Sequence, residues 1–341
     1  MLFNDPIGYA GELSSQFGPQ PIGLHVKDSH MDRLFSYFCR QYNKRQKIFD
    51  EVGAVKIVPS AKWSKSNKGD TSTLADVDVP VLSQRSIVTT TGGIFVLPKQ
   101  LSARPLKAVA RKSLPRPRDF PSNMQDVPDY MWKSLATGKM QAEYATSFEV
   151  DPTLCQKLDL MSFRGILGAL KRHEDVRTIF GFFGTYGSVF CFHTEDFEAL
   201  SVNILLDGAP KYWIVIAAEH RDKFNQLTAK LYSQENTMCE KPTSHLNFLV
   251  SPAQLQAQDI PYTEFIQYPG EIMVIMAGAH HAGFNLGVNY SENVYCGHPS
   301  MLEQLKKTNN LCCDCKEEDG KTRKHLPLNR SELDKLEEAA R

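Results

Sequence analysis

The stretch "SVFCFHTEDFEALSVN", residues 188–203, joins a strand-like apolar run to two groups that can bind a metal ion. Side chains two apart on a β-strand project from the same face, so His193 and Glu195 should share one space. Taken alone, the pair fits equally well a partly buried histidine hydrogen-bonded to a neighbouring acid. The stretch therefore indicates a strand of the core and makes a metal site a hypothesis to test.

Short apolar segments of the same kind follow one another along the second half of the chain, separated by Gly, Pro and Asp turns. They are "TIFGFFG" (178–184), "SVFCFH" (188–193), "LSVNILL" (200–206), "KYWIVI" (211–216), "FIQYPGEIMVIMAG" (265–278) and "SENVYCG" (291–297). Such a series predicts an all-β sandwich or barrel, and a jelly roll is the closest match.

Helical periodicity appears outside these segments. Residues 28–49 predict an amphipathic helix that begins at a Ser29–Asp32 capping box and leads into a short strand near residues 55–59. A second helix is expected over 158–170, and "RSELDKLEEAAR" (330–341) predicts a polar helix with Ser331 as its N-cap. The expected fold class is mixed α/β with a mainly β core.

Composition excludes some classes of function. Lys plus Arg and Asp plus Glu each total 39, so no bulk positive charge draws the chain onto nucleic acid. Neither a secretory signal nor an apolar run long enough for a membrane span is found, which predicts an intracellular protein. In that setting the 8 cysteines indicate thiols or metal ligands, especially the three in "LCCDCK" (311–316).

Residues 103–122 hold six Arg or Lys and four Pro without a sustained period. They predict an extended or mobile loop. A solvated linker is the preferred interpretation, and contact with DNA phosphates or a nuclear address is the alternative.

A second source of ligands lies in "YPGEIMVIMAGAHHAGFN" (268–285), which reads as a buried strand that ends in two histidines. Two histidines and one carboxylate on one side of a metal are the ligands of non-haem Fe(II) oxygenases. His193, Glu195 and His281 would supply them. A 2-oxo acid on such an iron also needs a fixed cation, and Lys211 with Trp213 on one strand face, near Ser201 and Asn203, could provide it. A lone surface lysine is the alternative for Lys211.

The segments "FHTEDFEALSVNILLDGAPKYW" and "GAHHAGFNLGVNYSEN" resemble the JmjC (jumonji C) domain of Fe(II)- and 2-oxoglutarate-dependent histone lysine demethylases. The closest resemblance is to the subfamily that pairs JmjN with JmjC and acts on trimethylated lysines 9 and 36 of histone H3. It implies a double-stranded β-helix in a chain divided into JmjN (20–63), a mixed connecting region (64–146), the JmjC jelly roll (147–311) and a C-terminal zinc-binding segment with a helix (312–341).

The resemblance also implies roles for individual residues. The iron ligands would be His193, Glu195 and His281, since "HAGFN" follows His281 whereas His280 stands where the family has an aromatic residue. The 2-oxoglutarate site would comprise Tyr144, Phe190, Asn203, Lys211 and Trp213. Strict strand alternation faces Phe190 away from His193, so a bend in that strand is assumed.

A structural zinc site is implied by "CEKPTSH" (239–245) and "CCDC" (312–315), with ligands Cys239, His245, Cys313 and Cys315 and with Cys312 as a spare. Four unrelated residues are the alternative.

The sequence departs from the family around the expected substrate pocket. Phe182 replaces a tyrosine that faces the methylammonium group, and Asn293 and Val294 replace a Ser-Thr pair. Leu246 and Tyr295 replace a lysine and an asparagine near the iron.

The expected function is demethylation of tri- or dimethyllysine in a histone H3 tail, with Fe(II), 2-oxoglutarate, O₂ and structural zinc. The protein would be nuclear, would not contact a membrane and would have a monomeric catalytic core. The nucleosome would be a further partner. Two alternatives remain, which are a protein hydroxylase with the same cofactors and a chromatin-binding JmjC protein with weakened catalysis.

Overall fold

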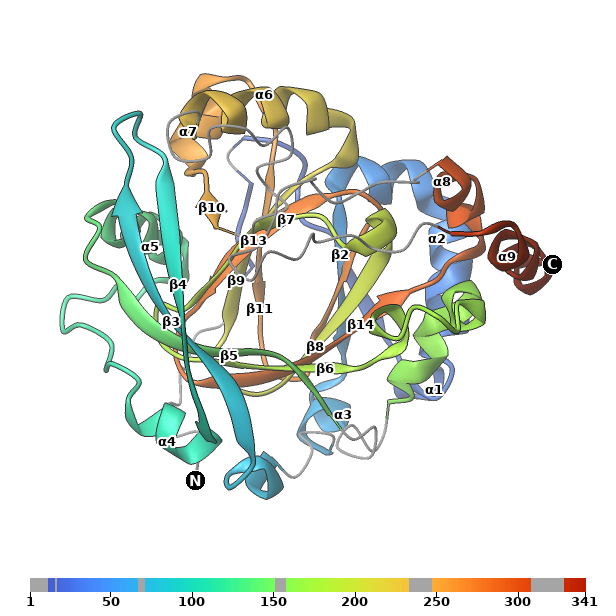
Figure 1. The fold of residues 1–341 in the computed structure, drawn as a ribbon, viewed down its shortest axis with the longest axis horizontal. Helices are drawn as coiled ribbons and strands as arrows, with labels where there is room; N and C mark the ends of the chain where they lie inside the picture. Colours follow the sequence, from blue (N-terminus) through green and yellow to red (C-terminus); the bar gives the residue numbers. More distant parts are fainter. Residues whose placement is uncertain (1–11, 16, 67–70, 151–157, 233–246, 308–327) are drawn as a thin grey trace.

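The computed structural model describes residues 12–15, 17–66, 71–150, 158–232, 247–307 and 328–341. Two sheets form the centre of the molecule (Figure 1). The large sheet has the spatial order β1 (Gly23–Val26), β2 (Ala54–Pro59), β12 (Ile272–Ile275), β8 (Leu200–Gly208), β14 (Asn289–Cys296), β6 (Phe180–Gly184), β5 (Gln141–Glu149), β3 (Asp78–Val88), β4 (Ile94–Pro105) and β10 (Phe248–Leu249). The small sheet has the order β11 (Thr263–Gln267), β9 (Lys211–Ile216), β13 (His280–Asn285) and β7 (Val189–His193).

The two sheets pack face to face. One apolar cluster joins Trp213 and Phe265 of the small sheet to Ala54 and Met273 of the large sheet. Within the described residues every strand pair is antiparallel except β1 with β2. The mainly β core in a mixed α/β chain confirms the fold class expected from the sequence.

Helices lie around the sheets. The α-helices are α1 (Asp28–Met31), α2 (Leu34–Val52), α3 (Ala61–Ser66), α4 (Leu106–Arg111), α5 (Val127–Ala136), α6 (Arg221–Leu231), α7 (Pro252–Ala257), α8 (Leu302–Lys307) and α9 (Arg330–Ala340). The 3₁₀ segments include η4 (Leu160–Ala169) and η6 (Asp196–Glu198). None of the helices in the described ranges combines the length and the apolar character that crossing a membrane requires.

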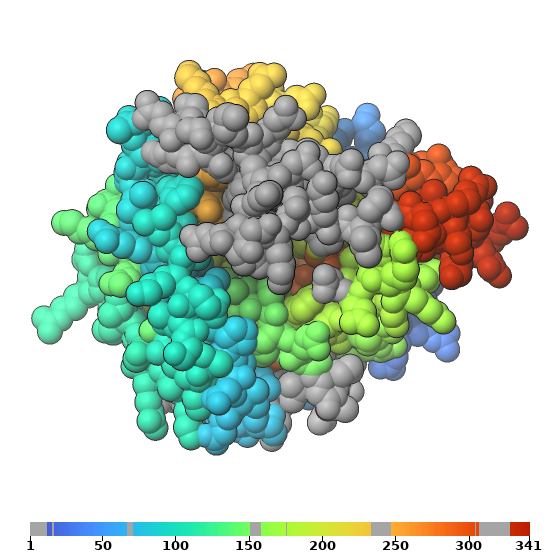
Figure 2. All heavy atoms as spheres, in the orientation of Figure 1, coloured from blue at the N-terminus to red at the C-terminus, as the bar shows by residue number. Residues whose placement is uncertain are grey.

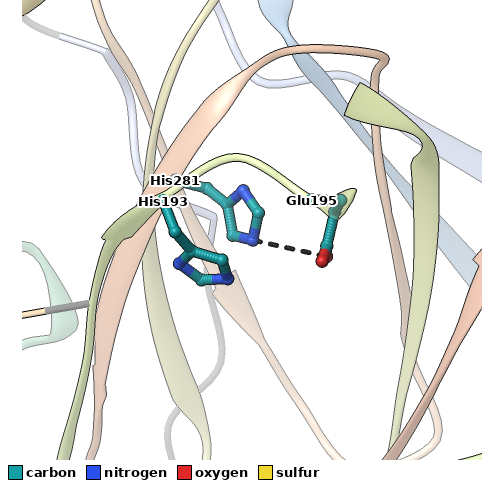
Figure 3. A group of neighbouring side chains, drawn as sticks. All are labelled: His193, Glu195 and His281. Carbon is teal, nitrogen blue, oxygen red and sulfur yellow. Dashed lines mark ion pairs between the residues drawn. The ribbon is translucent and has the colours of Figure 1, made fainter. Parts of the chain in front are cut away.

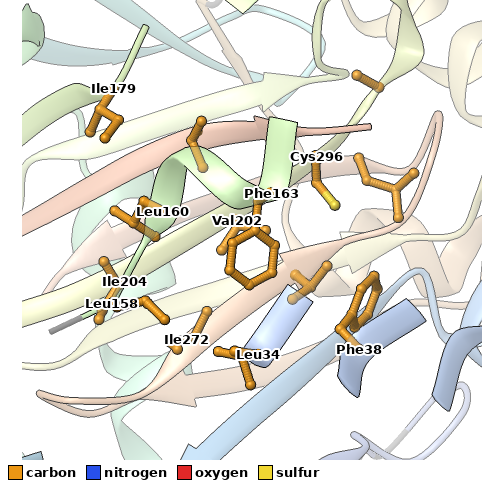
Figure 4. Packing of buried hydrophobic residues seen from close by; sticks show 14 of the residues in the cluster. Leu34, Phe38, Leu158, Leu160, Phe163, Ile179, Val202, Ile204, Ile272 and Cys296 are labelled. Carbon is orange, nitrogen blue, oxygen red and sulfur yellow. The ribbon is translucent and has the colours of Figure 1, made fainter. Parts of the chain in front are cut away.

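The largest apolar cluster joins the N-terminal helices to the large sheet. Leu34 and Phe38 of α2 belong to the same cluster as Val202 and Ile272 of the central strands, and Phe163 of η4 is fully buried among them (Figure 4). The fully buried apolar run of β12 explains its position between β2 and β8, where both of its edges are paired.

The N-terminal helix differs from its prediction. It is broken into α1 and α2, and the predicted Ser29–Asp32 capping box is wrong because Lys27 is the N-cap and Asp32 ends α1. The second piece ends at Gly53, whose φ of 77° is the left-handed conformation that glycine adopts at helix ends. The predicted strand near residues 55–59 is present as β2.

The basic segment 103–122 is not simply an extended loop. It contains the end of β4 and the helix α4, because Leu106 and Val109, three apart, are both completely buried. The long hairpin of β3 and β4 was not foreseen as strands at all.

Three further boundaries differ. The segment 158–170 is the 3₁₀ helix η4, kinked at Gly165, where a side chain would collide with the Gly297 carbonyl. The run 268–285 is not one strand, because β12 ends at Ile275 and the two histidines open β13. The cap of α9 is Asn329 in a capping box with Glu332, not Ser331.

The C-terminal helix is anchored by charge. Arg172 donates two hydrogen bonds, of 2.8 and 3.0 Å, to the buried carboxylate of Glu332. Bidentate pairs of this kind fix orientation as well as contributing energy. Figure 2 shows α9 at one end of the molecule and the β3–β4 side at the other.

Removing the apolar side chain at the centre of the large sheet should cost far more than removing the same side chain from the surface. Ile272 is fully buried and Ile48 is 53% exposed. We expect Ile272→Ala to lower the free energy of unfolding by roughly 2–5 kcal/mol, and Ile48→Ala to change it by less than about 0.5 kcal/mol. Urea denaturation measures both, and equal losses would contradict the described core.

Candidate metal centre

His193 reaches the centre from the last position of β7. The pairing of β7 with β13 contains a bulge, since His281 is opposite His193 but Gly283 is opposite Phe190. Two steps along β13 thus correspond to three steps along β7, which reverses the alternation of side chains. The bulge brings Phe190 and His193 to the same face, and it is the bend assumed from the sequence.

Glu195 lies beyond the strand. It is the N-cap residue of η6, with extended backbone angles (φ −69°, ψ 159°). Two residues of η6, Phe197 and Glu198, have φ values of 54° and 51°, a left-handed conformation that non-glycine residues seldom adopt. The expected proximity of His193 and Glu195 is therefore produced by a strand end followed by a tight turn rather than by one regular strand.

The three expected iron ligands lie together (Figure 3). One nitrogen or oxygen atom from each of His193, Glu195 and His281 lies within 4.8 Å of the others. The Nε2 atom of His281 is 3.6 Å from a carboxylate oxygen of Glu195. No other group of three such residues that could hold a metal occurs in the described part of the chain.

His280 belongs to the opposite face of β13. Its ring lies edge-on to Phe224 of α6, with 4.9 Å between the ring centroids. The alternation of β13 therefore separates the two adjacent histidines, one towards the metal group and one into the packing beneath α6.

The protonation of the group suits a metal ion. Burial lowers the pKa of His281 well below its usual range, so its imidazole is neutral at neutral pH. The Nδ1 atoms of His193 and His281 lie 2.7 and 3.3 Å from the carbonyls of Cys191 and Ala279. When each Nδ1 donates its proton to that carbonyl, Nε2 presents its lone pair to the metal.

The pKa of the Glu195 carboxyl group is shifted upward, in the opposite direction to that of His281. Burial raises its pKa, while His193 and a hydrogen bond from Ser201 oppose that rise. A divalent cation would remove the cost of the buried negative charge. The donor set of two imidazoles and one carboxylate thus fits a hard or borderline divalent ion such as Fe(II).

The expected cosubstrate residues on β9 lie beside the metal group. The ring centroid of Trp213 lies 4.6 Å from that of Phe190 and 6.0 Å from that of His281. Lys211 Nζ lies 5.8 Å from the Phe190 centroid. Lys211 is only 2% exposed, and burial lowers its pKa to about 7. Among the described residues no carboxylate is within ion-pair distance of Lys211, so an external anion could serve as its partner.

Asn203 offers a second unsatisfied group. Its side-chain oxygen is buried and accepts no hydrogen bond from the described residues. Gln267, which the sequence reading did not single out, accepts a hydrogen bond from Trp213 Nε1 (3.0 Å) and donates one to the Asn203 carbonyl (2.9 Å). The polar end of the otherwise apolar "FIQ" was the only sequence signal for this bridge between the sheets.

Tyr144 has no recorded contact with the metal group or with Lys211 among the described residues. It is buried on β5, and its ring lies 6.4 Å from that of Phe182 on β6. The structure records no hydrogen bond between Tyr144 and Lys211 in the described residues. The structure thus brings Tyr144 to the residue expected in the methyl pocket.

The altered substrate positions lie on β6 and β14. Asn293 is paired in register with Asn203, whereas Val294 is fully buried in the apolar core. Tyr295 donates a hydrogen bond of 2.9 Å from its hydroxyl to Asp196, the residue after Glu195. Asn293 and Tyr295 are therefore the members of this stretch placed on the side of the metal group.

The expected zinc ligands Cys239, His245, Cys313 and Cys315, together with Cys312 and Leu246, lie outside the described residues.

Comparison with known proteins points to the same segment of the chain. Residues 180–295 match the family described as "JmjC domain, hydroxylase". The chain is 28% identical over 255 residues to "Lysine-specific demethylase 4B" of Mus musculus, an alignment that covers 71% of this chain and 23% of the relative.

Two shorter alignments have higher identity. "Probable lysine-specific demethylase 4F" of Homo sapiens is 34% identical over 140 residues, and "Lysine-specific demethylase 4D" of Rattus norvegicus is 33% identical over 140 residues. Each covers 41% of this chain, and 22% and 28% of the respective relatives. The chain thus spans between 22% and 28% of the length of these relatives, and the matched JmjC segment includes the whole His193–Glu195–His281 group.

The adjacent histidines provide a matched test of the metal centre. We expect His281→Gln to weaken Mn(II) binding more than about 100-fold, because even the loss of an outer partner of a metal ligand costs 10–100-fold. His280→Gln should change the affinity little. Anaerobic Mn(II) titration followed by electron paramagnetic resonance measures this, since Mn(II) avoids thiolate sites. Equal losses in two folded variants would contradict the assignment of His281.

Proposed function

We propose that this chain is an Fe(II)- and 2-oxoglutarate-dependent dioxygenase that demethylates tri- and dimethyllysine in histone H3 tails. The observation that carries the proposal is the group His193, Glu195 and His281 beside the buried Lys211, which has no carboxylate partner among the described residues. The printed names of the relatives, all lysine-specific demethylases, support the choice of substrate.

Each cofactor would have its own set of residues. Fe(II) would be held by His193, Glu195 and His281, and the far carboxylate of 2-oxoglutarate would pair with Lys211. Phe190, Trp213, Asn203 and Tyr144 would complete the cosubstrate site. With O₂, these cofactors supply the hydroxylation of an N-methyl group, coupled to conversion of 2-oxoglutarate to succinate and CO₂, and the hydroxymethyl amine then releases formaldehyde.

The residues of the chain have three tasks in this reaction. Lys211 neutralises and orients the dicarboxylate, and the bulge in β7 positions the Phe190 ring against Lys211. The aromatic pair Phe190–Trp213 excludes water from the space next to the metal. Phe182 and Asn293 would line the methyl-lysine pocket, where an aromatic face attracts the cation and the amide oxygen accepts a hydrogen bond.

The wider assignment follows the resemblance. We propose JmjN at 20–63, the connecting region at 64–146, a double-stranded β-helix at 147–311, and a zinc segment at 312–341 with ligands Cys239, His245, Cys313 and Cys315. The setting would be the nucleus, with methylated histone H3 or the nucleosome as partner and a monomeric catalytic core.

Two specific observations keep alternatives open. The matched family is described as a hydroxylase, and Phe182 and Asn293 depart from the demethylase pocket, which favours a stable hydroxylation of another protein. Tyr295, tied to Asp196 beside Glu195, stands where an asparagine is expected, which favours weakened catalysis and a chromatin-binding role.

A panel of matched di- and trimethyllysine H3 peptides separates the three functions. We expect 2-oxoglutarate turnover with one formaldehyde and a loss of one methylene mass per cycle. Phe182 removes one oxygen acceptor, so discrimination for trimethyllysine should be weak and should rise several-fold in Phe182→Tyr/Asn293→Ser, since each C–H···O contact contributes about 0.5–1 kcal/mol. A gain of one oxygen mass without formaldehyde would identify the hydroxylase, and binding without turnover the decayed enzyme.

The pH dependence of 2-oxoglutarate binding tests Lys211. Its pKa lies near 7, so above that pH the free site loses its cation and the dicarboxylate must bind with uptake of a proton. We expect affinity to fall by up to about tenfold per pH unit between about pH 7 and about pH 8.5.

The matched variant Lys211→Met should bind 2-oxoglutarate more weakly by roughly 2–5 kcal/mol at low pH. Its affinity should not fall with pH between about pH 7 and about pH 8.5. Isothermal titration with Mn(II)-loaded protein measures both quantities. The same pH slope in wild type and Lys211→Met would assign the titration to another group.

A further inference from the structure

One side chain joins the turn that follows Glu195 to the turn that precedes His281 at the start of β13. Arg221, the first residue of α6, places Nη1 2.6 Å from the carboxylate of Glu198, three residues after Glu195. Its Nη2 donates a hydrogen bond of 3.3 Å to the carbonyl of Gly278, three residues before His281. Gly278 N–H in turn donates to the Glu198 carbonyl at 3.1 Å. We call Arg221, Glu198 and Gly278 the Arg221 clamp.

The Glu195 loop needs such a restraint. Phe197 and Glu198 both have positive φ, and residues held in this region persist only where the surroundings impose it. Tyr295 holds Asp196 by a hydrogen bond, and Phe197 is buried against the edge of His173. These contacts reach the first two residues of the turn, whereas Arg221 holds the third and connects it to the other loop.

The geometry at Gly278 indicates that the contact is a close one. A Cβ at this position would lie 2.3 Å from Arg221 Nη2, and the φ of 67° also favours glycine. The next residue, Ala279, presents the carbonyl that faces Nδ1 of His281. A shift of this loop would therefore move both the histidine and the acceptor that orients its ring.

The helix itself gives no reason for an arginine at this position. A cation in the first turn of a helix is disfavoured by the helix dipole. The guanidinium instead points its planar fork at one carboxylate and one carbonyl, the two-point geometry that lysine cannot reproduce.

We infer that Arg221 is a positioning residue of the metal centre, holding Glu195 and His281 at ligand distance through the Arg221 clamp. The inference rests on the metal-binding part of the proposed function and not on the identity of the substrate. It assigns to α6 a role in the reaction although none of its residues is a ligand.

Metal affinity tests the clamp without any peptide substrate. In Arg221→Met the two polar contacts are lost while an unbranched apolar side chain remains, and we expect Mn(II) binding to weaken by about 10–100-fold. The control is Lys223→Met on the same helix, whose partner Asp259 is largely exposed to solvent, and its affinity should stay within about twofold of wild type. The Mn(II) titration needs neither 2-oxoglutarate nor histone. Its result therefore tests the Arg221 clamp even if the demethylase proposal fails.

A conservative variant separates positioning from simple stabilisation. Arg221→Lys keeps the charge next to Glu198 but cannot bond Gly278 at the same time, so it should melt near wild type in the metal-free state and still bind Mn(II) several-fold more weakly. The Mn(II) resonance should broaden or shift in Arg221→Lys, as expected for displaced ligands. Wild-type affinity and an unchanged resonance in Arg221→Lys, or equal affinities of Arg221→Met and Lys223→Met, would overturn the inference.

Discussion

The antiparallel pairing of β7 with β13 is the constraint on which the site depends. It places His193 opposite His281, and the bulge between this pair and the Phe190–Gly283 pair decides which side chains of β7 face the metal group. Without the extra residue, Phe190 would point to the other face, and Lys211 and Trp213 would lose their aromatic neighbour. Gly283 permits the close approach, since a Cβ there would lie 2.0 Å from the Tyr212 carbonyl and 2.3 Å from the Phe190 ring. One irregularity in the small sheet therefore brings the candidate metal ligands and the aromatic pair Phe190–Trp213 to the same face.

The same interior holds charged groups that do nothing to stabilise an apolar core. Glu195 and Lys211 both have pKa values shifted by burial toward their neutral forms, which means that each destabilises the fold when charged. The sign of the lysine shift makes the folded chain more stable as pH rises from about 7 towards the ordinary lysine pKa, where the unfolded chain still binds the proton. Such costs are characteristic of sites that await a ligand of opposite charge. A cation at Glu195 and an anion at Lys211 would remove both.

The sequence predicted the apolar strands of the second half of the chain and the grouping of His193, Glu195 and His281, and it failed where tertiary contacts decide. Periodicity and turn residues located these strands because most of their residues are apolar, and the motif around "HAGFN" favoured His281 over His280. It missed β3 and β4, whose exposed and mixed residues lack a clear alternation. It misplaced the cap of α1 because that helix begins at Lys27 without a side-chain cap, and the cap of α9 because Asn329 stands two residues before Ser331. It took 103–122 as a loop because Pro and Arg outweighed the buried pair Leu106 and Val109. Arg221 left no local signal, and Gln267 left only the polar end of an apolar run, since the partners Gly278 and Trp213 are distant in sequence.

Most of the departures from the family that fall on described residues come from one sheet. The metal group and Lys211 come from β7, β9 and β13 of the small sheet, with Glu195 just beyond β7, and His280 is the one departure found on these strands. Phe182, Asn293 and Tyr295 come from β6 and β14 of the large sheet, which faces the same interior from the other side. Substitutions on these strands can reshape the space for a substrate without touching the pairing of β7 with β13. Tyr295 is the exception that connects them, because its hydroxyl reaches Asp196 in the loop of Glu195. A substitution at Tyr295 would therefore reach the loop of Glu195 through that hydrogen bond, whereas Phe182 and Asn293 belong to β6 and β14 alone.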